Sequence, residues 1–517
     1  MKRLALTLCL AASACATAPK APPPVVEKPA LPPLPVRPFA KPTPLQLVAV
    51  PSGNSQVVSV RLVFAAGSVD DPKGKEGLTA LTTALLAEGG TQSLSASEFA
   101  QALFPMAAEF SASTNKEFTV FAGRVHKDRF DAFLKLFADV LVAPRLDAKD
   151  FDRLRSRALN DLEKRLRGEN DEELSKAALD ALLFEGHPYR HPVGGTVASL
   201  KALTLADVKA HWKNVFTQER AVLGLAAPAQ DTAAWATKTT QALAALPAVG
   251  APLAPLPAVV PKNGEALIIQ RDTLSTAGAF GVPYNLRRGD ADFFPMAMAM
   301  SYLGEHRQMH GQLFMELREK RGLNYGTYAY AEHYQQEGWT AVPRVNVGRS
   351  QQDAMIWLRP VEPKNAMFAT RSAVQLLREL IEKPIPQKDF DAARGFLIGA
   401  TYLWEQTDQR RLGYAIDDVF YGTPGFMGRF RASLEVMTPE EAQGAVKKHL
   451  SPEALNFAFV TQDAKALREA LESGAPTPIT YPSPKTDEVL KKDVELSKAP
   501  LKPKSVRVLP ASQFMEQ

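Results

Sequence analysis

The sequence predicts an α+β protein of two homologous domains, each a mostly antiparallel sheet packed with helices. Three observations support this fold class. The chain of 517 residues is too long for one ordinary core, stretches typical of strands and of helices follow one another along it, and one short motif occurs twice. With 45% hydrophobic and 23% charged residues, the composition is that of a globular protein.

Residues 1–15 predict a secretory signal. A basic start, 1–3, precedes an apolar stretch, 4–12, that is too short to stay in a bilayer as a span. The run Ala-Ser-Ala-Cys that ends at Cys15 resembles a bacterial lipobox, in which the cysteine is lipidated, although that pattern usually has Leu where Ala12 stands. Cleavage by an ordinary signal peptidase in the same run is the alternative. Both interpretations place the protein in a bacterial cell envelope, in the periplasm, and lipidation would anchor it to the outer membrane.

Cysteine use and net charge exclude several classes of site. The two cysteines, Cys9 and Cys15, both lie in or at the edge of the signal, so the folded body has neither disulfides nor thiolate metal sites. Any metal would need His and carboxylate ligands. The net charge of +5 is small for this length and comes without a long basic run, which argues against nucleic acid as a partner.

Residues 16–44 predict a proline-rich tether. This stretch holds 11 prolines among Ala, Val and Lys, a composition that favours extended polyproline segments and cannot build a core. Such a spacer would hold the folded body away from a membrane if Cys15 carries lipid. The alternative is a leader without a role.

The body divides into two domains, 45–226 and 263–472. Between them, 227–262 is rich in Ala and Pro and is interpreted as an interdomain linker. After the second domain, 473–517 contains prolines and lysines with little periodicity and is interpreted as an irregular C-terminal arm.

The two domains share a motif that indicates internal duplication. Ala-Ser-Leu at 198–200 is followed by Thr204, and the same three residues at 432–434 are followed by Thr438. Each threonine has an acidic residue three positions later, the capping-box pattern that starts a helix. A strand-like run follows each predicted helix, at 221–225 and 455–460, so the repeat covers a helix and a strand.

Periodicity places the elements of the first domain in order. Val57 to Phe64 is rich in β-branched residues and predicts a strand. Leu78, Leu81 and Leu85 then recur at helical spacing. Further helices are predicted at 96–103, 126–141, 148–167, 173–184 and 207–216.

Three landmarks resemble the pitrilysin/insulinase family of zinc metallopeptidases. The first is the run VRLVFAAGS at 60–68, followed by Asp-Pro at 71–72 and Gly-Leu at 77–78. The second is His-Pro-Tyr at 187–189, and the third and most specific is LREKRGLNY at 317–325. Their order matches that of the family over roughly 45–472, which carries more weight than any single motif.

The family's metal motif is missing from this sequence. Active members carry His-x-x-Glu-His on the first helix, where two imidazoles bind Zn²⁺ and the glutamate is the general base. The resemblance aligns these positions with Ala80, Thr83 and Ala84. Alanine has no lone pair to donate, and the hydroxyl of Thr83 is too weak a base at neutral pH. We therefore expect no metal bound by this chain and no catalytic residues of its own.

The family's third ligand, a glutamate on a later helix, also has no counterpart here. The corresponding stretch offers Asn160 or Asp161. The simpler interpretation is that Asp161 and Glu163 are solvated charges on a helix rich in Arg and Lys.

Another metal site could involve the histidines. His306 and His310 are one helical turn apart and adjoin Glu305, but a pair without a third ligand binds weakly, and solvent-exposed loop histidines are the favoured interpretation. His187 and His191 flank prolines and are expected to shape a turn or to pack. The isolated histidines are expected to be structural; these are His126, His211, His333 and His449.

One functional element of the family is retained. In active members an Arg and a Tyr of the second domain hold the substrate carbonyl and stabilise the oxyanion, and the resemblance assigns these roles to Arg318 and Tyr325. The alternative is that Arg318 forms a structural ion pair with Glu316 or Glu319 and that Tyr325 simply packs.

The leading hypothesis is a non-catalytic subunit that pairs with a zinc-bearing homologue, which carries the His-x-x-Glu-His motif, and helps it to cleave peptides. Zinc is then expected in the partner and not in this chain. Whether the chain counts as an enzyme is left open. One alternative is an envelope peptide-binding or scaffold protein without catalysis, and another is a hydrolase that uses an unrecognised metal site such as His306 and His310.

Overall fold

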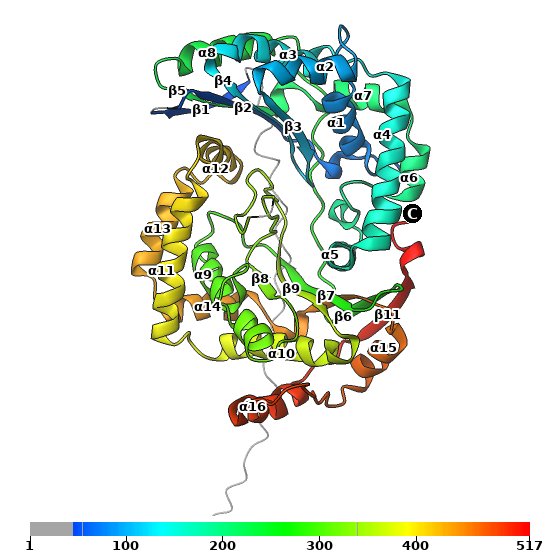
Figure 1. Ribbon diagram of the computed structural model, residues 1–517, viewed down its shortest axis with the longest axis vertical. Coiled ribbons are helices and arrows are strands. Elements are labelled where there is room, and N and C mark those ends of the chain that lie inside the picture. The colour runs from blue at the N-terminus through cyan, green and yellow to red at the C-terminus, as the bar shows by residue number, and fades with distance from the viewer. Residues whose placement is uncertain (1–44, 54, 339, 517) are drawn as a thin grey trace, which may run out of the picture.

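Each half of the chain builds one sheet in the computed structural model, which describes residues 45–53, 55–338 and 340–516 (Figure 1). The first half forms the upper lobe in Figure 1 and the second half the lower lobe. The predicted signal 1–15, with Cys15, and the predicted tether 16–44 lie outside the described residues. Within the described part of the chain, no helix has the length and apolarity that a membrane span needs.

The first sheet has five strands in the order β1-β5-β2-β4-β3. β1 and β5 run parallel, and the other neighbours run antiparallel. The predicted strand β2 is buried from Val58 onward, as its β-branched residues suit a sheet that is covered on both faces. The strands are β1 (Gln46–Ser52), β2 (Val57–Phe64), β3 (Glu109–Thr114), β4 (Thr119–His126) and β5 (Ala221–Pro228).

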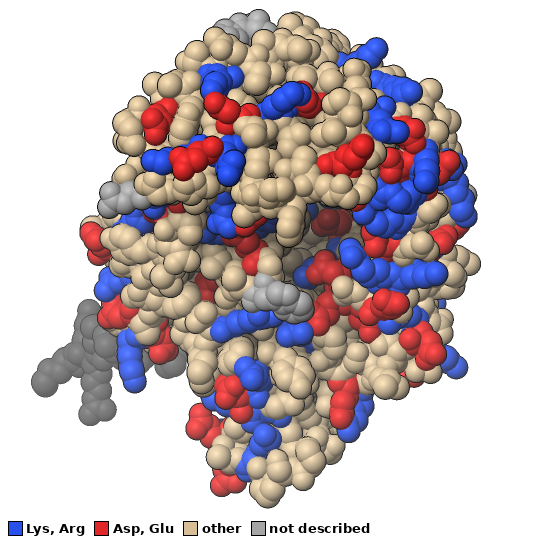
Figure 2. All heavy atoms as spheres, turned by 45° about the horizontal axis from the view of Figure 1, so that its top comes forward, with Lys and Arg blue, Asp and Glu red and all other residues tan. Residues whose placement is uncertain are grey.

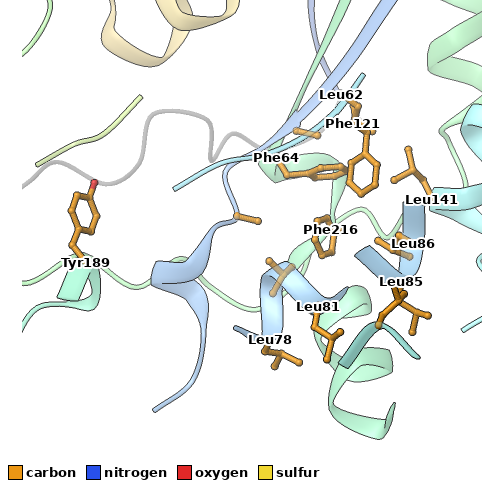
Figure 3. Packing of buried hydrophobic residues seen from close by; sticks show 14 of the residues in the cluster. Leu62, Phe64, Leu78, Leu81, Leu85, Leu86, Phe121, Leu141, Tyr189 and Phe216 are labelled. Atoms are coloured by element: carbon orange, nitrogen blue, oxygen red, sulfur yellow. The ribbon is translucent and has the colours of Figure 1, made fainter. Parts of the chain in front are cut away.

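Helices of the first half cover one face of this sheet (Figure 1). The leucines of α1 that recur at helical spacing belong to the same buried cluster as Phe64 and Phe216, whose rings meet edge to face at 5.2 Å between centroids (Figure 3). The helices are α1 (Leu78–Glu88), α2 (Ala96–Leu103), α3 (Phe130–Val142), α4 (Ala148–Asn160), α5 (Asp171–Leu183), α6 (Val197–Ala202), α7 (Leu205–Val215) and α8 (Thr232–Ala242).

The second half repeats the topology of the first. Its sheet has the order β11-β6-β10-β7-β9-β8, and its last five strands correspond one to one, in chain order and in position, to β1-β5-β2-β4-β3. The predicted duplication is therefore confirmed at the level of the fold. The strands are β6 (Glu265–Gln270), β7 (Thr276–Tyr284), β8 (Thr327–Tyr330), β9 (Gln352–Val361), β10 (Asn456–Thr461) and β11 (Ser505–Pro510).

Helices of the second half follow the same sequence of elements. α9 corresponds to α1, α11 to α4, α12 to α5 and α13 to α6. The helices are α9 (Phe293–Gly304), α10 (Ala366–Glu382), α11 (Gln387–Trp404), α12 (Asp408–Tyr421), α13 (Phe426–Val436), α14 (Pro439–His449), α15 (Ala464–Ser473) and α16 (Asp487–Lys498).

The halves exchange one helix each. α5 of the first half packs on the second sheet, where Leu174 and Leu182 share a cluster with Ile269 and Val460. The equivalent helix α12 packs on the first sheet through residues such as Ile416 (Figure 1). Each sheet is thus covered on one face by a helix of the other half, and the two halves share their cores.

The capping signals behave as the sequence predicts. The side chain of Thr204 accepts a hydrogen bond from the backbone N–H of Asp207, and that of Thr438 accepts one from Glu441. Both acidic side chains reach back to the capping threonine's N–H, so each pair forms a complete capping box.

Several predicted boundaries need correction. The helix predicted at 126–141 begins at Phe130, because His126 still belongs to strand β4. The helix predicted at 148–167 is α-helical only to Asn160 and continues as a π-helix, Asp161–Glu169. The predicted linker 227–262 contains α8, which packs on β1 and β5 of the first sheet.

The prediction of an irregular C-terminal arm at 473–517 is also wrong. It contains α16 and the strand β11, which pairs in parallel with β6 at the edge of the second sheet. Beyond β11, the chain returns to the first half, where the carbonyl of Met515 accepts a hydrogen bond from Val197 and that of Phe514 accepts one from Arg167. This segment joins the two halves because Phe514 is buried in the first half's core.

Candidate functional site

The three positions aligned with the metal motif lie on α1 and carry no metal ligand. Thr83 is 3% exposed, and its hydroxyl donates to the carbonyl of Thr79 and accepts from Thr114, both at 2.8 Å. Ala80 and Ala84 are half-buried and line a cavity. A zinc ion has no partner on this face of α1, so the side chains present do not fit one.

This first cavity has a volume of about 580 Å³ and is lined by residues of the first half together with Gln335 of the second half. One wall is α1 and the opposite wall is α4 with the π-helix that follows it. Most of its lining residues are apolar, and the charged ones lie on the later part of α4, on the π-helix and, for Glu173, on α5. The lining residues are Gly77, Ala80, Leu81, Ala84, Leu154, Arg157, Ala158, Asp161, Leu162, Arg165, Leu166, Asn170, Glu173, Pro192, Val193, Gly194, Leu200 and Gln335.

Asp161, one of the two third-ligand candidates, lines the first cavity, whereas Asn160 does not. The carboxylate of Asp161 is about half exposed and lies 3.8 Å from the guanidinium of Arg165 one turn later. Glu163 is exposed. Among the described residues, no group of three or more His, Cys, Asp or Glu side chains is arranged to hold a metal ion.

Two π-helical turns mark the places that the family resemblance singles out. One is Asp161–Glu169, at the third-ligand position, and the other is Phe314–Glu319, which carries Arg318. Because π-helical turns are rare and occur frequently at functional sites, both segments are candidates for function.

A second cavity of about 460 Å³ lies between the halves and adjoins the first. Figure 2 shows the molecule hollowed near the centre of its face, with basic and acidic side chains around the hollow. The cavities share several lining residues; these are Leu166, Glu173, Pro192, Val193 and Gln335. The remaining lining of the second cavity is Lys116, Lys176, Ala177, Asp180, His333, Tyr334, Gln336, Arg349, Asp353, Met355 and Trp357.

The charged groups of the second cavity have partners, and the ion pair between Arg349 and Asp180 joins the two halves. The ammonium of Lys116 donates to the carbonyl of Tyr189 at 2.6 Å, and the guanidinium of Arg349 lies 3.7 Å from Asp180 and 3.3 Å from Asp353. Burial lowers the pKa of Lys116 to about 8 and raises that of Asp353 to about 6.

Glu117 latches the two halves together beside this cavity. Its carboxylate is fully buried and accepts hydrogen bonds from the backbone N–H of Ser350 at 2.5 Å, the hydroxyl of Ser350 at 2.6 Å and the hydroxyl of Tyr189. Glu117 is not among the residues that the sequence singles out. Its only signal is a charged pair, Lys116 and Glu117, directly before an apolar strand.

Arg318 lies on the π-helical turn Phe314–Glu319, and Tyr325 lies between that turn and the edge strand β8. The side chain of Arg318 is 42% exposed, with its guanidinium 4.7 Å above the ring of Phe314 and its Nε 3.7 Å from Glu319. Tyr325 is 76% exposed, so the alternative that it simply packs is wrong. Neither residue lines the first or the second cavity, and the structure does not bring the pair to the degenerate motif on α1.

The ion-pair alternative for Arg318 is half right. Glu319 is its neighbour, but Glu316 binds Arg321 at 2.6 Å instead. Arg321 is buried and also binds Asp493 at 2.8 Å, so the structural arginine of this segment is Arg321.

His306 and His310 do not share a site. His306 is 1% exposed, with Nδ1 2.8 Å from the hydroxyl of Tyr330, so its prediction as an exposed loop histidine is wrong. Aromatic rings surround it, and burial lowers its pKa to about 4. His310 instead approaches Ser301 at 3.3 Å and packs on Phe396.

The other histidines have structural partners. His187 accepts a hydrogen bond from the backbone N–H of Tyr189 at 3.1 Å and so shapes the turn, as predicted. His191 contacts the carbonyl of Pro192 at 2.9 Å. His211 lies 2.8 Å from the hydroxyl of Thr79 at the start of α1. His449 lies 2.8 Å from Asp292.

Comparison with known proteins gives consistent results. Residues 47–197 match the family model described as Insulinase (Peptidase family M16), and residues 202–397 match the one described as Peptidase M16 inactive domain. The Non-peptidase homolog YmxG of Helicobacter pylori is 24% identical over 408 residues, which cover 78% of this chain and 89% of that protein. An uncharacterized zinc protease of Mycobacterium bovis is 25% identical over 395 residues, which cover 76% of this chain and 85% of that protein.

Solved structures share the fold. A peptidase M16 inactive domain from Pseudomonas fluorescens superimposes with a TM-score of 0.71 at 24% identity, covering 80% of this chain and 95% of that one. A protease from Helicobacter pylori gives a TM-score of 0.69 at 16% identity, covering 80% of this chain and 97% of that one.

Proposed function

The chain belongs to the insulinase family, peptidase family M16, and we propose that it is an inactive member that pairs with a zinc-bearing homologue and completes the peptide site of that partner. The alanines at positions 80 and 84 support the loss of activity, since they leave α1 without metal ligands. In the proposed pair, zinc held by the partner supplies the activated water.

The exposure of Arg318 and Tyr325 is the observation that carries this proposal. Both lie outside the two internal cavities and are open to solvent, so they are free to meet a second chain. A guanidinium and a phenol hydroxyl are donors suited to a peptide carbonyl and to the negative charge that develops on its oxygen. In the pair, Arg318 and Tyr325 would steady that oxygen from across the interface.

The test mixes the purified chain with a His-x-x-Glu-His homologue from the same source and follows cleavage of a peptide library. We expect no bound zinc and no cleavage by this chain alone, activity in the mixture, and a loss of about a hundred- to a thousandfold in Arg318→Ala, the size expected for one lost oxyanion donor. Lys320→Ala is the matched control, because it removes a neighbouring exposed charge and should leave activity unchanged. Cleavage by the pure chain, or full activity of the Arg318→Ala mixture, would sink the proposal.

A second candidate is an envelope peptide-binding or scaffold protein that has lost all catalysis. The two adjoining internal cavities favour it, because they offer a peptide site that needs no partner. Inertness of the mixture, together with a stable complex that forms equally well with Arg318→Ala, would select this function.

Envelope localisation and a lipid anchor at Cys15 form part of both proposals. Metabolic labelling with a fatty acid should modify the wild-type chain and not Cys15→Ser. Labelling that is absent from both chains would favour cleavage by the ordinary signal peptidase.

A further inference from the structure

A third cavity lies in the second half, lined by residues of α9, α11 and α13 and of the segment that follows β8 (Figure 1). Its volume is about 120 Å³. An apolar cavity of about 150 Å³ holds one benzene molecule, so this cavity accommodates a group of only a few heavy atoms. Residues 333–335 line both this cavity and the second one, so the two adjoin.

Aromatic rings form much of the wall of the third cavity. They come from several elements; examples are Phe293 of α9, Trp404 of α11, Tyr414 of α12 and Tyr334 after β8. The rings of Tyr330 and Tyr334 stack at 4.4 Å between centroids. The negative faces of such rings attract a cation, and a methylated ammonium also buries its methyl groups against them. The wall therefore suits a methylated ammonium group.

Glu305 brings a negative charge to this wall without a cation beside it. Its carboxylate accepts a hydrogen bond from the backbone N–H of His306 at 3.3 Å, and among the described residues no Lys, Arg or His side chain forms an ion pair with it. Burial raises the pKa of Glu305, because no positive charge offsets its own. The other carboxylate of the wall, that of Glu332, is neutralised by Arg288 at 2.7 and 3.0 Å. An apolar ligand would leave Glu305 without a partner, whereas a cation would supply one.

Arg344 contributes the opposite charge at the solvent-exposed side of the same cavity. This residue lines the cavity and is exposed, and no carboxylate in the described part of the chain pairs with its guanidinium. The cavity thus has one unpaired charge of each sign, Glu305 among the rings and Arg344 at the rim. Such an arrangement matches a ligand that carries both charges.

We propose that the third cavity binds a small zwitterion, whose methylated ammonium lies among the aromatic rings beside Glu305 and whose carboxylate meets Arg344. This site goes beyond both candidate functions, because its ligand is not a peptide. It also involves neither Arg318 nor Tyr325 and requires no zinc-bearing partner.

The experiment measures binding to the purified full chain by isothermal titration calorimetry. The four probes have nearly the same shape and differ in charge: glycine betaine carries both charges, choline only the ammonium, 3,3-dimethylbutanoate only the carboxylate, and 3,3-dimethylbutanol neither. We expect glycine betaine to bind most tightly. Loss of the ammonium should weaken binding about thirtyfold, the size of a desolvated cation–π contact. Loss of the carboxylate should weaken it only about two- to fivefold, because Arg344 is exposed.

Two variants remove the unpaired charges one at a time. Glu305→Gln keeps the shape of the side chain and should weaken glycine betaine and choline about tenfold or more, without affecting 3,3-dimethylbutanol. Arg344→Gln should lower glycine betaine to the affinity of choline and leave choline unchanged. The matched controls are Glu435→Gln and Arg429→Gln, since both residues are exposed on α13 and lie outside the cavity lining.

A third variant fills the cavity instead of changing its charge. Ala297 of α9 is half-buried and lines the cavity, so Ala297→Trp should abolish binding of all four probes. Melting curves by circular dichroism show whether each variant folds. If Glu305→Gln does not fold, the comparison of the four probes on the wild-type chain and the Ala297→Trp variant still decide the question.

Three outcomes would overturn the proposal. The first is equal binding of the four probes, or no binding of any. The second is unchanged binding of glycine betaine in a folded Glu305→Gln or Ala297→Trp variant. The third is tighter binding of glycine than of glycine betaine, which would assign the cavity to an unmethylated ammonium.

Discussion

The two halves have the same strand order and equivalent helices, yet they fill equivalent spaces differently. In the first half, α1, α4 and α6 contribute to a cavity of about 580 Å³. In the second half, the corresponding helices α9, α11 and α13 contribute to one of about 120 Å³. Ala80 and Ala84 of α1 line the larger cavity, whereas the large side chains of Phe293 and Met300 of α9 line the smaller one. Side-chain size, not topology, therefore decides which copy keeps the larger cavity.

The largest expected loss of stability comes from removing the contacts by which Glu117 joins the two halves. Glu117→Ala leaves the N–H and hydroxyl of Ser350 and the hydroxyl of Tyr189 buried without their acceptor. We expect a loss of about 3–5 kcal/mol in the free energy of unfolding, measured by urea titration. Glu109→Ala, which removes an exposed carboxylate that pairs with Arg124, should cost less than about 1 kcal/mol. Equal costs for the two variants would mean that Glu117 does not latch the halves.

Truncating the exchanged helices should damage the opposite half. Leu179→Ala in α5 and Leu412→Ala in α12 each remove a fully buried side chain and should cost about 2–5 kcal/mol. Hydrogen exchange should accelerate in β7 and β10 for Leu179→Ala, and in β1 and β5 for Leu412→Ala, because those strands contact the truncated helix. Acceleration confined to the half that carries the mutation would contradict the exchange.

Acid should weaken both halves through their buried histidines. Burial lowers the pKa of His187 and His211 in the first half, and of His306 in the second, to about 4. The unfolded chain binds these protons near pH 6.5, so stability is complete above that pH and is lost as the pH falls toward 4, with a ceiling of about 3 kcal/mol per histidine. Urea midpoints at pH 7.5, 5.5 and 4.5 test this, and His211→Gln should flatten the decline. An equally steep decline in His211→Gln and in the wild type would refute it.

The smallest expected loss of stability comes from removing either of the two matched helix caps. Thr204→Ala and Thr438→Ala each remove the same capping hydrogen bond and should each cost about 1 kcal/mol, as seen in thermal or urea unfolding. Serine at either position keeps the acceptor and should restore most of the loss. A difference of more than about 1 kcal/mol between the two alanine variants would show that the caps are not equivalent.

Local signals carried the predictions that succeeded. The β-branched run of β2, the leucine spacing of α1 and the capping boxes at Thr204 and Thr438 depend on near neighbours, and the structure contains all of them. The absence of metal ligands at positions 80 and 84 also follows from the sequence, because alanine cannot bind a metal ion. For these features, sequence spacing was sufficient.

Features that depend on distant contacts could not be predicted. His306 is buried because Tyr330 and Trp357 come from other strands, and nothing around it in the sequence indicates that. The strand β11 exists through its pairing with β6, more than 200 residues earlier in the chain. Glu117 is a latch only because Ser350 lies opposite it. Such positions are specified by the tertiary fold and not by local pattern.

The exchanged helices also determine the order in which the parts of the protein can fold. A ribosome delivers the first sheet long before α12, so the face of that sheet that α12 covers stays open until residues 408–421 emerge. The chain therefore cannot complete one half and then the other, as independent domains do during synthesis. For the same reason, a gene split between the halves would yield two fragments that each need the other to close. The duplicated body is one folding unit.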